Sequence, residues 1–457
     1  MPDTSDYKWD ASHSLVIETL RYQSASLLLY GSVLEDAVGE AFLNLLQQLH
    51  EQPTHSLNCV RAYGQWFMAL ADGGMSWQEH LLTRLLTTEN PFTRYAQRFA
   101  VDDLPDSLKA AACHDLNAIY QISQCSSQRV SQWLQNIVAL PYCPVAWETT
   151  TTSAALAASS VGTRLRSHNL WDTVIQSQNW KECLDAIAHY YHQHGTGLAA
   201  QYHALRWTNG ELIGIASPDP IRLDELTAYD IPRQALIQNT EALITGYRAL
   251  HVLLYGSRGS GKSSLVKALL NEYGDRGLRL VEVGKQDFQD LPSIVDHLRG
   301  LPQTFIIFVD DLSFEDDDDA FKSLKVVLEG SVTARPQNVV VYATSNRRHL
   351  IREFHGDRPR PKDADEIHSW DTLQEKLSFS DRFGLTLTFE PADQSTYLSI
   401  VHHLAHQENI LLPIDDLDYR ALQWATRHNG RSGRTARQFI DALNAELRTQ
   451  YPKLLVI

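Results

Sequence analysis

The sequence predicts an α/β domain built on a parallel sheet, preceded by a mainly helical region and followed by a small helical domain. In the N-terminal half, apolar residues recur at three- and four-residue spacings, which indicates amphipathic helices. After residues 217–226, short β-branched runs alternate with longer amphipathic segments, and beyond Pro391 the pattern is purely helical. We therefore expect a helical N-terminal region over 1–215, an α/β domain over 216–391 and a helical lid over 392–457.

Length and charge exclude several classes of protein. The chain has 457 residues, 43% of them hydrophobic, and 40 Lys+Arg against 55 Asp+Glu give a net charge of −15. The chain is long enough for two to four domains, each with its own hydrophobic core. The excess of acidic residues disfavours a protein that coats nucleic acid, because such proteins bind phosphates through Lys and Arg. The sequence has neither an apolar stretch of about 20 residues nor a secretory signal pattern. We expect a cytoplasmic protein with no membrane segment.

The helical region carries no chemical motif. The polar, β-branched run Glu148–Ala155 breaks its helical pattern and predicts a loop or hinge. The five cysteines of the chain are widely spaced without a CxxC pair, which predicts reduced thiols and not a zinc site.

Five short apolar runs are the expected strands of the α/β domain. They are His251–Tyr255, Leu278–Val283, Thr304–Val309, Asn338–Ala343 and Leu385–Phe389. Three helices are expected after them, near Gln394–Gln407, Leu417–Arg427 and Thr435–Arg448.

The first expected strand runs directly into GSRGSGKSS, which matches the phosphate-binding pattern GxxxxGK[ST] and precedes a helical segment. Glycines let the backbone N–H groups wrap a phosphate chain at a helix N-terminus. Lys262 would reach the β- and γ-phosphates, and Ser263 would hold Mg²⁺. The alternative is a glycine-rich structural turn. The predicted nucleotide-binding residues are Gly256, Ser257, Arg258, Gly259, Ser260, Gly261, Lys262, Ser263 and Ser264.

Two aspartates follow the third expected strand, in FIIFVDDLSFEDDDD. Ligands of open α/β sheets bind at the carboxyl ends of strands, so Asp310 is a candidate Mg²⁺ ligand and Asp311 a candidate to polarise the attacking water. Glu315 is a substitute for Asp311, whose side chain is one methylene shorter than glutamate. Asp316–Asp319 are expected to form a solvated loop or helix start.

Together these motifs resemble the AAA+ ATPases, P-loop proteins that assemble with ATP at subunit boundaries. The resemblance implies that Asn346, in YATSN, is a sensor of the γ-phosphate or attacking water. It would follow a strand that lies between the strand before GSRGSGKSS, called Walker A, and the strand before Asp310 and Asp311, called Walker B. In SDRFG the resemblance implies that Arg382 is an arginine finger, and in GRSGRTARQF that Arg434 is a second sensor. A turn-capping Asn346 and a solvated arginine face are the alternatives. Tyr229 and Ile231 are the candidate adenine contacts.

More narrowly, residues 190–398 resemble the bacterial family called domain of unknown function 815. The resemblance rests on HYYHQHGTGLAAQYHALRW, LLYGSRGSGKSSLVKALLNEY, FVDDLSF, VLEG, ATSNRRHL and EKLSFSDRFG. Paired aspartates at the Walker B position belong to that pattern, whereas many related ATPases have Glu in the second place.

These features predict an ATP- and Mg²⁺-dependent AAA+ protein that forms a homo-oligomer and acts on an unidentified protein partner through its N-terminal region. One alternative is a slow or non-hydrolysing switch or scaffold. A DNA-linked loader is another, supported by local basic segments and opposed by the charge. A substrate-threading loop would lie in VGKQDFQDLPSI, where Phe288 is the sole aromatic residue and Asp287 or Asp290 is a candidate helix cap. The charged insertion at 346–368 is expected to be a surface loop.

Overall fold

The computed structural model describes residues 11–51, 56–148, 169–312, 319–329, 335–346, 381–428 and 430–450. The chain forms two compact units, Met1–Tyr202 and His203–Ile457. Several sequence predictions lie outside the described residues, namely Glu315, the three aspartates that follow it, most of the Glu148–Ala155 run and nearly all of the charged insertion.

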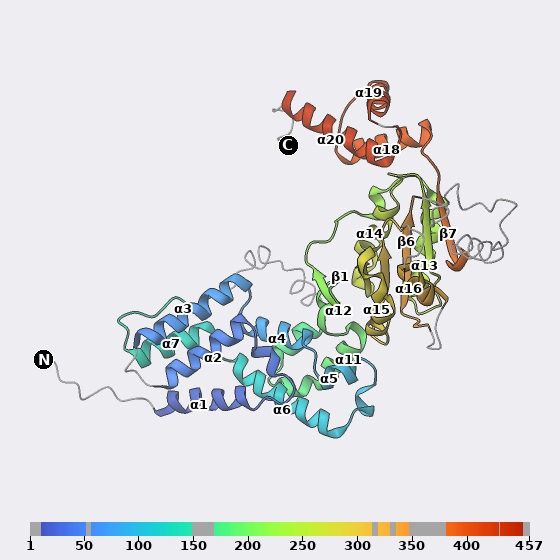
Figure 1. Cartoon of the computed structure of the whole chain (residues 1–457). Coiled ribbons are helices and arrows are strands. Elements are labelled where there is room, and N and C mark those ends of the chain that lie inside the picture. The colour runs from blue at the N-terminus through green and yellow to red at the C-terminus, as the bar shows by residue number, and fades with distance from the viewer. Residues whose placement is uncertain are drawn as a thin grey trace. The chain divides into compact units, whose positions relative to one another are not determined.

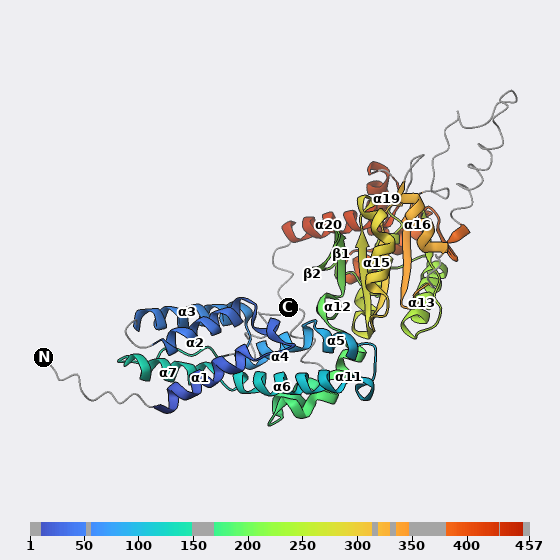
Figure 2. The ribbon, with the colours of Figure 1, turned by 60° about the horizontal axis from the view of Figure 1, so that its bottom comes forward.

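The N-terminal unit is helical, as Figures 1 and 2 show for its described residues. Asp36, Ser76 and Asn90 cap the starts of α2, α4 and α5 with their side chains, which satisfies backbone N–H groups that have no partner within the helix. The α-helices are α1 (Ala11–Ala25), α2 (Ala37–His50), α3 (Ser56–Gly73), α4 (Trp77–Thr87), α5 (Pro91–Ala96), α6 (Asp106–Ser123), α7 (Ser127–Val138), α10 (Asn169–Gln176), α11 (Leu184–His194) and α12 (Gly197–Gln201). Single 3₁₀ turns are η1 (Gly31–Leu34), η3 (Val101–Asp103) and η4 (Trp180–Cys183).

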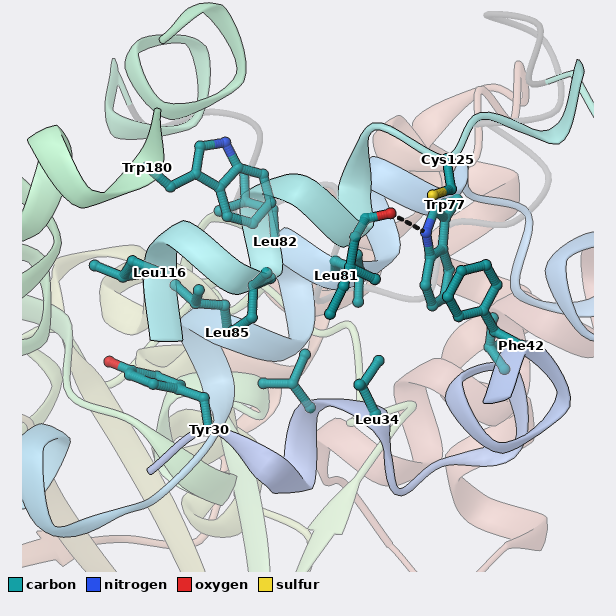
Figure 3. Packing of buried hydrophobic residues seen from close by; sticks show 14 of the residues in the cluster. Tyr30, Leu34, Phe42, Trp77, Leu81, Leu82, Leu85, Leu116, Cys125 and Trp180 are labelled. Carbon is teal, nitrogen blue, oxygen red and sulfur yellow. Dashed lines mark hydrogen bonds between the residues drawn. The ribbon is translucent and has the colours of Figure 1, made fainter. Parts of the chain in front are cut away.

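Aromatic and leucine side chains pack together in the core of this unit (Figure 3). The ring of Phe42 lies 4.5 Å from that of Trp77 and 5.5 Å from that of Trp66, measured between centroids. The Trp77 indole N–H donates to the Ile122 carbonyl at 3.0 Å, so its polar atom is satisfied within the core. Burial of these large rings adds to the hydrophobic stabilisation that the aliphatic core residues supply.

A buried carboxylate ties the start of the chain to α6. Asp115 has no exposed surface, and its oxygens accept from the backbone N–H groups of Leu28, Leu29 and Tyr30 at 2.7–3.0 Å. His114 adds a contact of 3.0 Å from Nδ1. Because an unpaired buried N–H is costly, the carboxylate determines how the α1–η1 connection sits on α6.

We expect Asp115→Ala to destabilise the N-terminal unit by about 3–5 kcal/mol, because it leaves buried donors without an acceptor. Asp115→Asn keeps one acceptor oxygen and should cost less. Asp106→Ala is the control, because Asp106 lies on the same helix but its side chain is 99% exposed. It should change the free energy of unfolding by less than about 0.5 kcal/mol. Hydrogen exchange of the full-length chain, resolved by peptide, measures the effect, with peptides of the second unit as internal reference. Equal protection in all variants would show that Asp115 is dispensable.

A seven-stranded sheet organises the second unit, in the order β2-β1-β4-β5-β6-β3-β7. All neighbouring strands are parallel except β1 and β2, which form an antiparallel pair. The strands are β1 (Ala204–Thr208), β2 (Glu211–Ile215), β3 (Val252–Gly256), β4 (Leu278–Val283), β5 (Thr304–Val309), β6 (Val339–Ser345) and β7 (Leu385–Phe389). Strand β6 lies between β5 and β3, which is the order that the AAA+ resemblance implies, and the predicted α/β P-loop fold class is confirmed.

Strands β1 and β2 had no counterpart among the expected strands. Each has five residues, and β2 at the edge of the sheet is partly exposed along its length. Such short strands lack the continuous apolar run that reveals a buried parallel strand. Both strands precede residue 216, at which we expected the α/β domain to begin from the sequence. The second compact unit begins earlier, at His203.

Helices cover the sheet and form a separate cluster after it. The elements that accompany the sheet are η5 (Leu223–Glu225), α13 (Asp230–Ile244), α14 (Lys262–Tyr273), η6 (Gly274–Arg276), η7 (Lys285–Asp290), α15 (Leu291–Leu298) and α16 (Asp319–Glu329). The last three helices, α18 (Gln394–Gln407), α19 (Ile414–Arg427) and α20 (Gly433–Gln450), lie together in Figure 1 around their own apolar core. A bilayer-spanning helix, which needs about 20 apolar residues, is not found in the described parts of the chain.

Candidate nucleotide site

A cavity of about 550 Å³ lies where the carboxyl ends of β3, β5 and β6 meet the N-terminus of α14 and the lid helices α18 and α20. Its lining combines the glycine-rich loop, the two aspartates, the end of β6, the segment before α13 and the lid. The lining residues are Ile221, Glu225, Leu226, Thr227, Tyr229, Arg258, Gly259, Ser260, Gly261, Lys262, Ser263, Ser264, Asp310, Asp311, Thr344, Asn346, Ile400, Leu404, Gly433, Arg434, Arg437 and Gln438. The tertiary structure thus brings most of the predicted site residues together.

The loop between β3 and α14 needs glycine for two different reasons. Gly256 has φ of 145°, and a Cβ there would lie 1.9 Å from the Phe389 carbonyl oxygen on β7. Gly261 has φ of 85°, with no atom within 4 Å of where a Cβ would be. The first glycine permits a close backbone approach, and the second keeps open space at the start of a helix. A phosphate chain fits that space and the helix dipole.

Lys262 folds back over this loop. Its ammonium donates to the carbonyls of Gly256 at 3.1 Å and Ser257 at 2.7 Å, and its side chain is almost completely buried. Desolvation lowers the pKa of Lys262, while the nearby carboxylates of Asp310 and Asp311 oppose that shift. A largely desolvated cation next to open space is a favourable place for a polyanion.

Asp310 and Ser263 meet across the cavity. The Ser263 hydroxyl donates to Asp310 Oδ1 at 2.6 Å, and the Thr344 hydroxyl donates to the same oxygen at 2.6 Å. A hydroxyl and a carboxylate are hard oxygen ligands of the kind that Mg²⁺ takes directly or through water. The donor set therefore fits Mg²⁺ at the position predicted for it.

Asp311 adopts a backbone conformation that is uncommon for a residue with a side chain. Its φ is 53°, in the left-handed region, which costs of order 1–3 kcal/mol and persists only where the surroundings hold it. Its carboxylate Oδ1 accepts from the Asn346 amide at 2.8 Å, and Asn346 Oδ1 lies 3.4 Å from Lys262 Nζ. Asn346 thus links the second aspartate to the lysine of the loop.

Two lid arginines face the cavity. The backbone N–H of Arg434 donates to the Gly259 carbonyl at 3.3 Å, so the lid contacts the loop directly. Arg437 pairs with Glu408 at 3.4 Å and approaches Glu225, of the segment before α13, at 3.9 Å. Other arginines of the lid lie elsewhere, as Arg420 does with Asp416 on α19. The solvated arginine face expected as an alternative describes those residues better than Arg434.

The two candidate adenine contacts differ in position. Tyr229 lines the cavity, packs on Phe389 at 5.2 Å between centroids and donates its hydroxyl to the Glu390 carbonyl at 2.8 Å. Ile231 is 85% exposed and does not reach the cavity, because it lies in the first turn of α13 with its side chain in solvent. The apolar lining comes instead from residues that sequence reasoning missed, chiefly Ile221, Leu226, Ile400 and Leu404. Their only sequence signal was apolar character at ordinary helix and loop positions.

Arg382 lies away from this cavity, just before β7. Its guanidinium forms an ion pair with Glu329 at the end of α16, and its side chain is 17% exposed. The prediction that it acts on another subunit's nucleotide therefore concerns a different face of the unit.

The segment after β4 forms the turn η7 and does not present its aromatic side chain. Phe288 is 2% exposed. Asp290 accepts a hydrogen bond of 2.8 Å from the Trp207 indole of β1, and neither it nor Asp287 caps α15 with its side chain. Asp290 occupies the N-cap position of α15, as one of the two predicted alternatives, but its carboxylate accepts from Trp207, which is distant in sequence, and not from the helix backbone.

Among solved structures, the chain is similar to RuvB of Thermotoga maritima, a Holliday junction branch migration motor. The two are 16% identical over 49% of this chain and 72% of RuvB, with a TM-score of 0.31. A second similar structure is the replication initiator DnaA bound to AMPPCP and single-stranded DNA, at 18% identity over 51% of this chain and 68% of DnaA, with a TM-score of 0.35.

Among curated proteins, none matches this sequence. A family model does match, over residues 200–447, which is more than half of the chain and includes the whole glycine-rich loop, both aspartates, Asn346 and the lid arginines. The chain therefore belongs to the family described as protein of unknown function (DUF815).

Proposed function

We propose that this chain binds ATP with Mg²⁺ in the cavity and hydrolyses it where two copies of the chain meet. The single observation that carries the proposal is the convergence of Lys262, Ser263, Asp310, Asp311 and Asn346 in one cavity that lid arginines also line. Each supplies the group that phosphoryl transfer requires, and they come from distant parts of the chain.

In this proposal the residues divide the work by position. Backbone N–H groups of the loop hold the phosphates, and Lys262 exchanges its carbonyl partners for phosphate oxygens. Ser263 and Asp310 hold Mg²⁺, which supplies charge neutralisation on the phosphates. Asp311 accepts a proton from the attacking water, and Asn346 orients both the water and the Asp311 carboxylate. Tyr229 and the apolar lining hold the base.

The lid gives the site a way to respond to what is bound. Arg434 and Arg437 both line the cavity. Arg437 forms one ion pair with Glu408 within the lid and another with Glu225, which belongs to the segment before α13. Phosphate oxygens would compete with these carboxylates for the guanidinium groups, so the lid has two energetically distinct positions. We propose that the N-terminal unit, which carries no chemical motif, transmits this motion to an unidentified protein partner.

A specific observation favours a second function, an ATP-dependent switch or scaffold with little turnover. The second carboxylate is the shorter aspartate, and it is already engaged by the Asn346 amide. In that case assembly itself would be the output.

Steady-state ATP hydrolysis by the full-length chain, with mass measured by light scattering with and without ATP, tests the proposal. Turnover that rises with ATP-dependent assembly is the expected result. Tight binding and assembly without turnover would favour the switch, and no nucleotide binding at all would reject both functions.

We expect Arg382→Ala to leave ATP affinity near normal and to lower turnover of the assembled form by about 10³-fold, since a guanidinium acting across subunits offsets charge on the transferred phosphoryl. The control is Glu329→Gln, which breaks the same ion pair but keeps the arginine. It should retain turnover. If both variants lose activity equally, the ion pair is structural and the arginine-finger assignment is wrong.

A further inference from the structure

Thr344 contacts both aspartates of the site through one atom. It is the next-to-last residue of β6, is 2% exposed and lines the cavity. Its hydroxyl donates to Asp310 Oδ1 at 2.6 Å and accepts from the Asp311 backbone N–H at 3.0 Å. Sequence reasoning did not single it out, because a threonine near the end of a β-branched strand is ordinary.

Neighbouring bonds fasten the same turn to β6. The Leu312 N–H donates to the Thr344 carbonyl at 2.7 Å, and the Ser345 hydroxyl donates to the Leu312 carbonyl at 2.8 Å. Backbone bonding therefore already fixes where Leu312 lies. The Thr344 hydroxyl does something different, since it reaches the Asp310 carboxylate and the left-handed Asp311.

We propose that Thr344 is a positioning residue that fixes the Asp310 carboxylate for Mg²⁺ and the Asp311 backbone for water activation. The inference rests on the proposed function of the cavity. Asp310 Oδ1 accepts from the hydroxyls of Ser263 and Thr344 at 2.6 Å and, at the longer distance of 3.2 Å, from the Asp311 N–H, so the carboxylate cannot rotate without breaking hydrogen bonds. Groups that orient a metal ligand in this way typically change metal affinity by about 10–100-fold when removed.

Only a hydroxyl can both donate and accept at this position, which gives a sharp set of variants. Thr344→Val keeps the shape and loses both bonds, whereas Thr344→Ser keeps both. Thr240→Val is the control, because it removes another fully buried hydroxyl, one that bonds to Leu236 and Tyr342 away from the cavity. If Thr344→Val does not fold, Thr344→Ala, which also lacks the hydroxyl, takes its place.

The measurement is the affinity of each full-length variant for the slowly hydrolysed analogue ATPγS, by calorimetry with and without Mg²⁺, together with kcat for ATP. We expect the ratio of ATPγS affinity with Mg²⁺ to that without Mg²⁺ to be about tenfold smaller in Thr344→Val than in the wild type. Its affinity without Mg²⁺ should be unchanged, and its kcat should be lower. Thr344→Ser and Thr240→Val should keep the gain.

Two results would overturn the inference. One is a Thr344→Val variant with the wild-type Mg²⁺-dependent gain, and the other is a Thr344→Ser variant that loses as much as Thr344→Val. The proposed function fails separately, and visibly, if the wild type itself binds no ATPγS in the presence of Mg²⁺.

Discussion

Lys262→Ala is expected to weaken ATP binding by at least about 100-fold, which corresponds to roughly 2.7 kcal/mol. The side chain is 6% exposed, and its ammonium hydrogen-bonds to neutral oxygens of the loop and of Asn346 at 2.7–3.4 Å. Removing it deletes the one buried cation at the start of α14, next to the open space at Gly261. Titration calorimetry with ATP and Mg²⁺ measures the change.

Lys267→Ala is the matched control, because Lys267 lies on the same helix but pairs with Asp219 at 3.4 Å with its side chain partly exposed. It should leave ATP affinity within about threefold of the wild type. Desolvation lowers the Lys262 pKa, so loss of the lysine should not reduce folding stability, and a thermal melt checks this. A Lys262→Ala variant that binds ATP like the wild type would disprove the nucleotide-site assignment.

Asp311→Asn is expected to lower ATP turnover by about 10²–10⁴-fold while ATP affinity stays within a few-fold of the wild type, which is the usual contribution of a general base. Asparagine keeps an oxygen that can accept from the Asn346 amide, so the hydrogen bond at 2.8 Å survives and only the charge is lost. Steady-state hydrolysis and calorimetry on the same preparations separate the two quantities.

Asp296→Asn serves as the control for loss of one carboxylate, since Asp296 is exposed on α15 and pairs with Arg299. It should hydrolyse ATP at the wild-type rate. Undiminished turnover in Asp311→Asn would exclude Asp311 as the base. If neither the wild type nor the variant turns over bound ATP, the switch or scaffold is the better account.

The five predicted strands agree closely with observed strands of the sheet. Leu278–Val283, Thr304–Val309 and Leu385–Phe389 match β4, β5 and β7 residue for residue. The runs of β4 and β5 could be recognised because buried strands of a covered parallel sheet are nearly continuously apolar. Strand β7, at an edge of the sheet, was recognised by its alternation of leucine or phenylalanine with threonine. Strands β1 and β2 were missed because each has only five residues and neither has a continuous apolar run.

The sequence by itself identified the glycine-rich loop, the paired aspartates after β5 and Asn346 after β6. These groups could be recognised because phosphate and Mg²⁺ binding require particular residue types at fixed positions next to strands and helices. Only the tertiary structure decided which groups meet. It brought Ile221, Leu404 and Thr344 to the cavity and left Ile231 in solvent. The physical reason is that an apolar or hydroxyl side chain has the same local preferences whether it lines a site or a core. Its role depends on neighbours that are distant in sequence. The Thr344 hydroxyl on β6, for example, hydrogen-bonds to Asp310 and Asp311 after β5.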